Sequence, residues 1–69
     1  MSINGNGAGI TRRTPASDLP ELLLPEEAAA WLGVGRNTIY ELIRRDEVRS
    51  IRFGRLLRVL KSSLVELAR

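Results

Sequence analysis

The sequence contains neither cysteine nor histidine. Without cysteine, the chain has no disulfide framework and no thiolate ligand for a metal. Without histidine, zinc sites and the usual general acid–base and nucleophilic catalytic systems lack their central residue. The remaining carboxylates, serines and arginines show no recognisable catalytic spacing. We therefore expect a protein that is not an enzyme and has no catalytic residues, no metal and no cofactor.

Long apolar runs are also missing. No stretch approaches the roughly 20 residues of a membrane span, and the N-terminus has no apolar signal-peptide segment. We therefore expect a cytoplasmic protein without a membrane partner. The 69 residues are enough for one domain. Because residues 1–17 are rich in Gly, Asn, Ser and Thr, we expect a disordered N-terminal tail over residues 1–20 and a domain over residues 21–69.

The formal net charge of +3 is distributed unevenly along the chain. Residues 1–20 carry +1, residues 21–35 carry −3 and residues 36–69 carry +5. A basic second half suggests an anionic partner that contacts one face of the protein. Ordinary solubilising charge is the alternative, and a charge count by itself favours that alternative.

Two short helices are expected in the first half of the domain. Pro25 suits the first position of a helix, and two glutamates follow in the first turn, where carboxylates complement the helix dipole. Gly33 ends this helix, which we place at residues 25–32. Apolar residues at i, i+3 and i+4 from Ile39 predict a second helix over residues 36–45.

The junction between these helices has the spacing of a helix-turn-helix. Ala29 is the small residue where the helices cross, Gly33 forms the turn and Val34 fills the space beneath it, while Ile39 and Leu42 face inward. Such a pair presents the first turns of its second helix to a DNA major groove. The residues predicted to contact the major groove are Arg36, Asn37, Thr38 and Tyr40. The alternative is a generic helical hairpin whose polar face is only solvated.

From residue 49 the period changes to two, which predicts a pair of half-buried strands joined at Gly54-Arg55. We expect the apolar residues of this hairpin to face inward and the arginines to face outward. The predicted inward residues are Ile51, Phe53, Leu57 and Val59. Leu56 points away from its neighbour Leu57 and should be exposed.

Arginines recur every third residue in the hairpin, at positions 49, 52, 55 and 58, with no acidic residue among them. Protection of an edge strand explains one or two of them but not four. A projecting hairpin can place an arginine in a narrow minor groove, where the negative potential is concentrated. The predicted wing contacts are Arg52, Arg55 and Arg58, and Arg44 and Arg45 are predicted to reach phosphates.

A short last helix is expected to follow the hairpin. Ser63 and Glu66 have capping-box spacing, and Leu64 and Leu67 would form the inner face of this helix. Trp31 is expected to pack in or over the core rather than to bind a partner protein. The predicted fold class is therefore α+β: a small winged helix-turn-helix with two helices, a two-stranded antiparallel wing and a short C-terminal helix.

Several segments together resemble the excisionase type of the MerR-like winged-helix domain. The matching segments are residues 23–29 (LLPEEAA), 32–34 (LGV), 38–40 (TIY), 42–45 (LIRR), 51–55 (IRFGR) and 62–64 (SSL), with Arg36 and Arg58 between them. The resemblance covers about residues 22–68, and its motifs are specific enough to assign the fold.

The resemblance implies binding to double-stranded DNA, with the second helix in the major groove and the wing in the adjacent minor groove. Because stand-alone members of this size are typically phage excisionases, or recombination directionality factors, the resemblance implies such a role. These proteins bind beside an attachment site, bend the DNA and direct integrase toward excision. The resemblance also implies a phage integrase of the tyrosine recombinase type as partner, cooperative self-association on DNA and a place on DNA in a bacterial cytoplasm. The alternatives are a prophage transcriptional regulator with the same fold, or a protein-interaction module using Trp31 and Leu56.

Four positions depart from the family pattern. Leu24 stands where a serine or threonine usually caps the first helix, so the cap must come from Glu27 alone. Gly35 replaces a capping serine before the second helix. Asp46 occupies a position where glycine is common, and Leu57 occupies one where a large aromatic residue is frequent. These departures affect local stability and leave the predicted DNA-facing residues in place.

Overall fold

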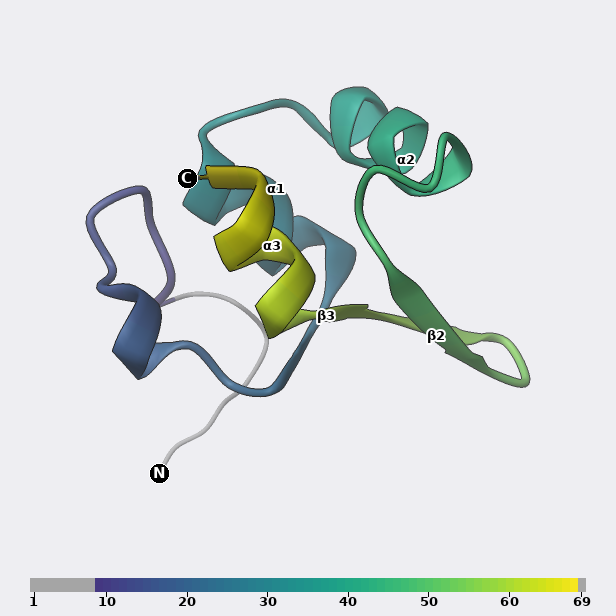
Figure 1. Ribbon diagram of the computed structural model, residues 1–69, viewed down its shortest axis with the longest axis horizontal. Helices are drawn as coiled ribbons and strands as arrows, with labels where there is room; N and C mark the ends of the chain where they lie inside the picture. Colours follow the sequence, from purple (N-terminus) through teal and green to yellow (C-terminus); the bar gives the residue numbers. More distant parts are fainter. Residues whose placement is uncertain (1–8, 69) are drawn as a thin grey trace.

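The computed structural model describes residues 9–68, which form three α-helices and a small antiparallel sheet (Figure 1). In chain order the elements are η1 (Ala16–Asp18), β1 (Leu22–Leu23), α1 (Pro25–Leu32), α2 (Arg36–Arg44), β2 (Ser50–Phe53), β3 (Leu56–Leu60) and α3 (Lys61–Ala68). The β2–β3 hairpin extends away from the helices to a free tip (Figure 1). The predicted α+β winged helix-turn-helix is confirmed.

The sheet has a third strand that the sequence did not predict. Its order is β1-β3-β2, with β3 in the centre and both neighbours antiparallel to it. β1 contains only two residues, Leu22 paired with Leu60 and Leu23 paired with Val59. Such a short run cannot show the period-two alternation by which a strand is recognised. It nevertheless attaches the chain before α1 to the base of the wing.

Helix α1 begins and ends at the predicted residues. The backbone N–H of Leu24 donates to Oε1 of Glu27 over 2.8 Å, and Leu24 itself has no side-chain acceptor. The expectation that Glu27 alone supplies the cap is therefore confirmed. At the other end Gly33 has a φ of 76°, a left-handed conformation that glycine adopts without steric cost. Its N–H and that of Val34 both donate to the carbonyl of Ala29, which closes the turn.

The core lies where α1, α2 and α3 meet the central strand. Ile39 from α2, Leu64 from α3 and Val59 from β3 have no exposed surface. The buried apolar residues are Leu19, Leu23, Ala28, Ala29, Ile39, Val48, Val59 and Leu64. Val34 and Leu42 pack against this cluster, as the helix-turn-helix spacing predicted.

Helix α2 ends at Arg44, and Asp46 follows with a left-handed φ of 64°.

The facing of strand β2 differs from the prediction. Ile51 is paired with Arg58 and Arg52 with Leu57, so the arginine of β2 shares a face with the inward residues of β3. The prediction that Ile51 and Phe53 face inward is therefore wrong: they are 37% and 51% exposed. Cross-strand partners always share a face of the sheet. The two-residue turn pairs Phe53 with Leu56 and Ile51 with Arg58, so Ile51 and Phe53 lie on the face opposite to Leu57 and Val59.

Helix α3 begins at Lys61, two residues before the predicted cap. The predicted capping box of Ser63 is therefore wrong, since Ser63 lies within the helix. Its Oγ instead accepts a hydrogen bond of 2.8 Å from the backbone N–H of Arg49 and joins α3 to the start of the hairpin. Leu64 is buried as predicted, but Leu67, in the last turn of the helix, is 39% exposed.

The segment before the sheet is folded against α1 rather than extended into solvent. Residues 1–8 of the predicted tail lie outside the described residues, whereas residues 9–20 have a defined path that includes η1. Leu19 joins the core, and Nε1 of Trp31 donates to the carbonyl oxygen of Thr14 over 2.7 Å. The predicted packing role of Trp31 is confirmed. The sequence did not predict that residues 9–20 pack against α1, because the apolar residues of this segment are isolated among polar ones and show no period.

Candidate nucleic-acid interface

One face of α2 is turned away from the core. Successive residues of a helix are rotated by about 100°. Since Ile39 is buried and Leu42 and Ile43 pack beside it, the opposite face is centred on Asn37 and Glu41. The four residues predicted for the major groove, Arg36, Asn37, Thr38 and Tyr40, are all exposed.

A single groove runs between this helix and the wing. Its walls come from α2 and from the inward face of the hairpin, because Arg52 is paired with Leu57 and both point toward α2. The residues that line it are Asn37, Tyr40, Glu41, Ile43, Arg44, Arg52, Arg55 and Leu57. The structure thus brings together five of the predicted contact residues from two separate elements: Asn37, Tyr40, Arg44, Arg52 and Arg55.

The other predicted residues lie around this groove. Thr38 and Arg45 lie in a shallower depression on the opposite flank of α2. Arg36, at the start of α2, approaches Glu26 of α1, with 3.8 Å between Nη2 and Oε2. Arg58 points from the other face of the wing, where Nη1 donates to the carbonyl oxygen of Leu57 over 3.0 Å. The predicted wing set is therefore divided, with Arg58 turned away from the groove.

The tip of the wing is a two-residue turn. Phe53 and Leu56 are paired, and Gly54 and Arg55 connect them. Gly54 has a φ of 61°, and tight hairpin turns require this conformation. Arg55 is consequently held at the end of the hairpin, exposed and on the border of the groove.

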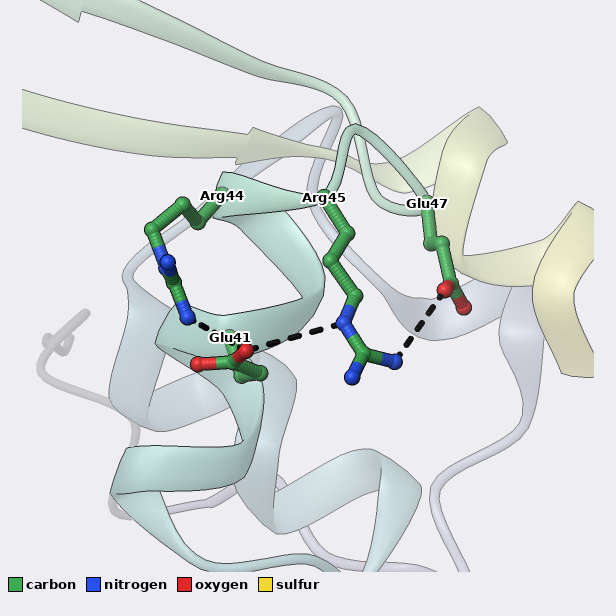
Figure 2. Close-up of polar contacts among 4 residues, drawn as sticks. All are labelled: Glu41, Arg44, Arg45 and Glu47. Atoms are coloured by element: carbon green, nitrogen blue, oxygen red, sulfur yellow. Dashed lines mark hydrogen bonds and ion pairs between the residues drawn. The ribbon is translucent and has the colours of Figure 1, made fainter.

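An alternating series of charges crosses the C-terminal part of α2 (Figure 2). Glu41 forms ion pairs with Arg44, one turn later, and with Arg45, whose Nε lies 3.6 Å from Oε2. Arg45 also approaches Glu47, with 3.6 Å between Nη1 and Oε2. All four side chains are substantially exposed, so these pairs contribute little to the free energy of folding. They show that the two arginines and the two glutamates lie side by side on this surface.

Glu41 is the residue of this surface to which the sequence analysis gave no role. Glu41 is a single acid among arginines, whereas DNA contacts are expected from basic and hydrogen-bonding side chains. The signal that identifies it is its spacing, three residues before Arg44 and four before Arg45, which places opposite charges side by side on a helix.

The groove contains residue types that can bind a polyanion. Arginine forms paired hydrogen bonds with guanine or phosphate, asparagine forms them with adenine, and a tyrosine hydroxyl can bind phosphate. Within residues 9–68, no three His, Cys, Asp or Glu side chains gather where a metal ion could be held. In the same part of the chain, no helix is long and apolar enough to cross a membrane.

The fold and this groove define a winged helix-turn-helix domain. Residues 22–69 match the family described as a helix-turn-helix domain, and the chain belongs to that family. A protein of Saccharopolyspora erythraea named "Probable excisionase" is 43% identical over 47 residues, which are 68% of this chain and 48% of that relative. The chain thus spans about half the length of this curated relative.

Proposed function

We propose that this protein is a sequence-specific DNA-binding architectural factor of the excisionase type, with a MerR-like arrangement of helix and wing. The observation that carries the proposal is the shared groove, in which the outward face of α2 meets Arg52 and Arg55 of the wing. A recognition helix in the major groove and a hairpin in the adjacent minor groove require this relative placement.

The residues have different roles in the proposed complex. Asn37 faces outward from the first turn of α2, at a position from which it contacts base edges. Arg36 starts the helix and enters the major groove beside it. Thr38 and Tyr40 lie on the two flanks of α2 and hold the phosphates on either side.

The basic residues at the end of α2 and on the wing complete the contact. Arg44 and Arg45 reach the phosphate backbone, Arg52 lies inside the groove and Arg55 enters the minor groove from the tip. Arg58 lies on the outer face, so its part in DNA binding is limited to a phosphate on that side.

The biological role proposed is to bind beside a phage attachment site, bend the DNA and direct a tyrosine-type integrase toward excision. The relative named as a probable excisionase supports this role. Several copies would assemble side by side on the DNA, and the integrase, not this chain, would perform the chemistry. The absence of cysteine and histidine from the sequence accords with a non-catalytic protein.

The first test is the salt dependence of DNA binding. If about four to six phosphates are neutralised, the logarithm of the affinity should fall with the logarithm of salt concentration at a slope of roughly −4 to −5. Gel shifts or fluorescence anisotropy over a salt series would measure it. A binding constant independent of salt, or no binding to any duplex at low salt, would contradict the proposal and favour a protein-interaction module.

The second test separates recombination from transcription. Footprinting on DNA that contains an integrase attachment core and on DNA that contains a promoter shows where the protein binds. Protection beside the attachment core, with increased excision by the integrase in vitro, is expected of an excisionase. Protection confined to the promoter would assign the same fold to a transcriptional regulator.

A further inference from the structure

Glu41 occupies the centre of the outward face of α2. It lies four residues after Asn37 and three before Arg44, so these residues follow one another along a single stripe of the helix. Glu41 also lines both the groove toward the wing and the depression on the opposite flank. In the proposed complex, a residue at this position points into the major groove and toward the base edges.

The ion pairs of Glu41 both involve the same oxygen of its carboxylate. Both the contact with Arg44 and the 3.6 Å contact with Arg45 are made by Oε2, and Oε1 takes part in neither (Figure 2). Oε1 is therefore the oxygen left for a further donor. The side chain of Glu41 is 42% exposed, so this oxygen is accessible from solvent.

A carboxylate in the major groove is selective because it only accepts hydrogen bonds. Cytosine and adenine both present an exocyclic amino donor there, but adenine carries the acceptor N7 beside it, which repels a carboxylate, so glutamate pairs with the amino group of cytosine. Guanine presents only acceptors in the major groove, and phosphate oxygens repel the carboxylate. Stabilisation of the fold is a weak reason for an acid at this position, since exposed ion pairs contribute little.

We infer that Glu41 is a specificity-determining residue: Oε1 accepts a hydrogen bond from the amino group of a cytosine in the major groove, and the negative charge weakens binding to other sequences. The ion pairs with Arg44 and Arg45 position the carboxylate for this contact. The inference rests on the proposed DNA-binding function and adds to it the base that one residue reads.

Glu41→Gln tests this inference, and Glu47→Gln is its matched control. Each substitution removes one negative charge and one ion-pair partner of Arg45. Glu47, however, follows α2 and lines a different depression, together with Asp46 and Arg49. The wild type first selects its preferred duplex from a pool with randomised positions. Dissociation constants of all three proteins are then measured on that duplex and on a scrambled one, at the same salt concentration.

The two variants should behave differently on the two duplexes. Glu47→Gln should tighten binding to both by a similar factor, because only its charge is changed, and should leave their affinity ratio unaltered. Glu41→Gln should tighten binding to the scrambled duplex but not to the preferred one, so that the ratio falls by about tenfold, because the glutamine amide also donates and no longer disfavours bases that present acceptors. A repeated selection with Glu41→Gln should lose one cytosine preference and keep the others. The ratio is insensitive to any partial unfolding, because both duplexes sample the same protein.

Two results would overturn the inference while leaving DNA binding intact. One is the same affinity ratio for Glu41→Gln as for Glu47→Gln; if both duplexes also lost affinity equally, Glu41 would be a structural partner of the arginines. The other is a lost preference for a base other than cytosine. Failure of the wild type to bind any duplex would instead refute the proposed function and this inference together.

Discussion

At the scale of single residues, Arg55 illustrates how position gives a common side chain a particular role. It stands at the end of a two-residue turn, exposed and next to the groove, and no ion pair ties it to the body of the domain within the described residues. An arginine in this position has little effect on folding. In the proposed complex its role is to contact the DNA.

Substitution of Arg55 by alanine should therefore separate DNA binding from folding. We expect Arg55→Ala to weaken DNA binding by about tenfold, the loss of a single good arginine contact, and to leave the thermal melt nearly unchanged. Arg13→Ala, which removes the same charge from the N-terminal segment, is the control and should weaken binding much less. Titration by anisotropy and melting by circular dichroism measure the two quantities. An equal loss of folding would mean that Arg55 is structural.

Two apolar residues that the sequence predicts to face inward should differ strongly in their contribution to the free energy of unfolding. Ile39 is fully buried, whereas Phe53 is 51% exposed on the outer face of the wing. We expect Ile39→Ala to lower the free energy of unfolding by about 2–5 kcal/mol through loss of burial and creation of a cavity. Phe53→Ala should cost less than about 1 kcal/mol. Urea denaturation of both variants measures the difference, and comparable losses would contradict the register of the hairpin.

At the scale of elements, the helices are the parts whose limits follow most directly from local sequence. Pro25 and Gly33 mark the two ends of α1, because proline lacks the N–H that the first turn leaves unpaired and glycine adopts the left-handed C-terminal conformation. Helix α3 was less predictable. Its start at Lys61 is fixed by the continuation of β3, and the spacing of Ser63 and Glu66 imitates a cap that the chain does not use.

The end of α2 offers a direct test of backbone strain. Asp46 has a φ of 64°, a conformation that costs most residues roughly 1–2 kcal/mol and glycine very little. We expect Asp46→Gly to raise the free energy of unfolding by about 0.5 kcal/mol, since part of the relief is offset by the greater freedom of glycine in the unfolded chain. Chemical denaturation would measure the change. Asp46→Asn removes the same charge and separates the electrostatic contribution, and a loss of stability in Asp46→Gly would contradict the strain.

At the scale of the whole molecule, residues 9–20 belong to the folded unit. Thr14 accepts the indole hydrogen bond, and Leu19 joins the core from a segment that precedes the helix-turn-helix. The side chain of Arg12 also lies over the end of α1, where an added Cβ at Gly33 would come within 2.7 Å of its Cδ. In a domain of this size a few such contacts are a large fraction of the stability.

Removal of residues 1–19 should therefore destabilise the domain. We expect the midpoint of thermal unfolding to fall by several degrees, because a loss of 1 kcal/mol shifts a small domain by about 4–8 °C. Trp31 is the only tryptophan, so its emission reports on the contact and should move to longer wavelength as the indole becomes hydrated. Trp31→Phe, which removes the hydrogen bond to Thr14 but keeps an aromatic ring, should cause a smaller loss. An unchanged melt after truncation would show that the segment is dispensable.

The sequence by itself determined the helix-turn-helix, the position of the wing and the basic second half of the chain. These depend on local rules: the period of apolar residues, the conformations available to proline and glycine, and the count of charges. The tertiary structure alone decided which side of the wing each arginine occupies, that Leu22–Leu23 forms a strand, and that residues 9–20 pack against α1. It also decided that Glu41 lies among the arginines of the groove. These features depend on strand register and on contacts between distant residues, whose free energies are set by partners that a local pattern does not specify.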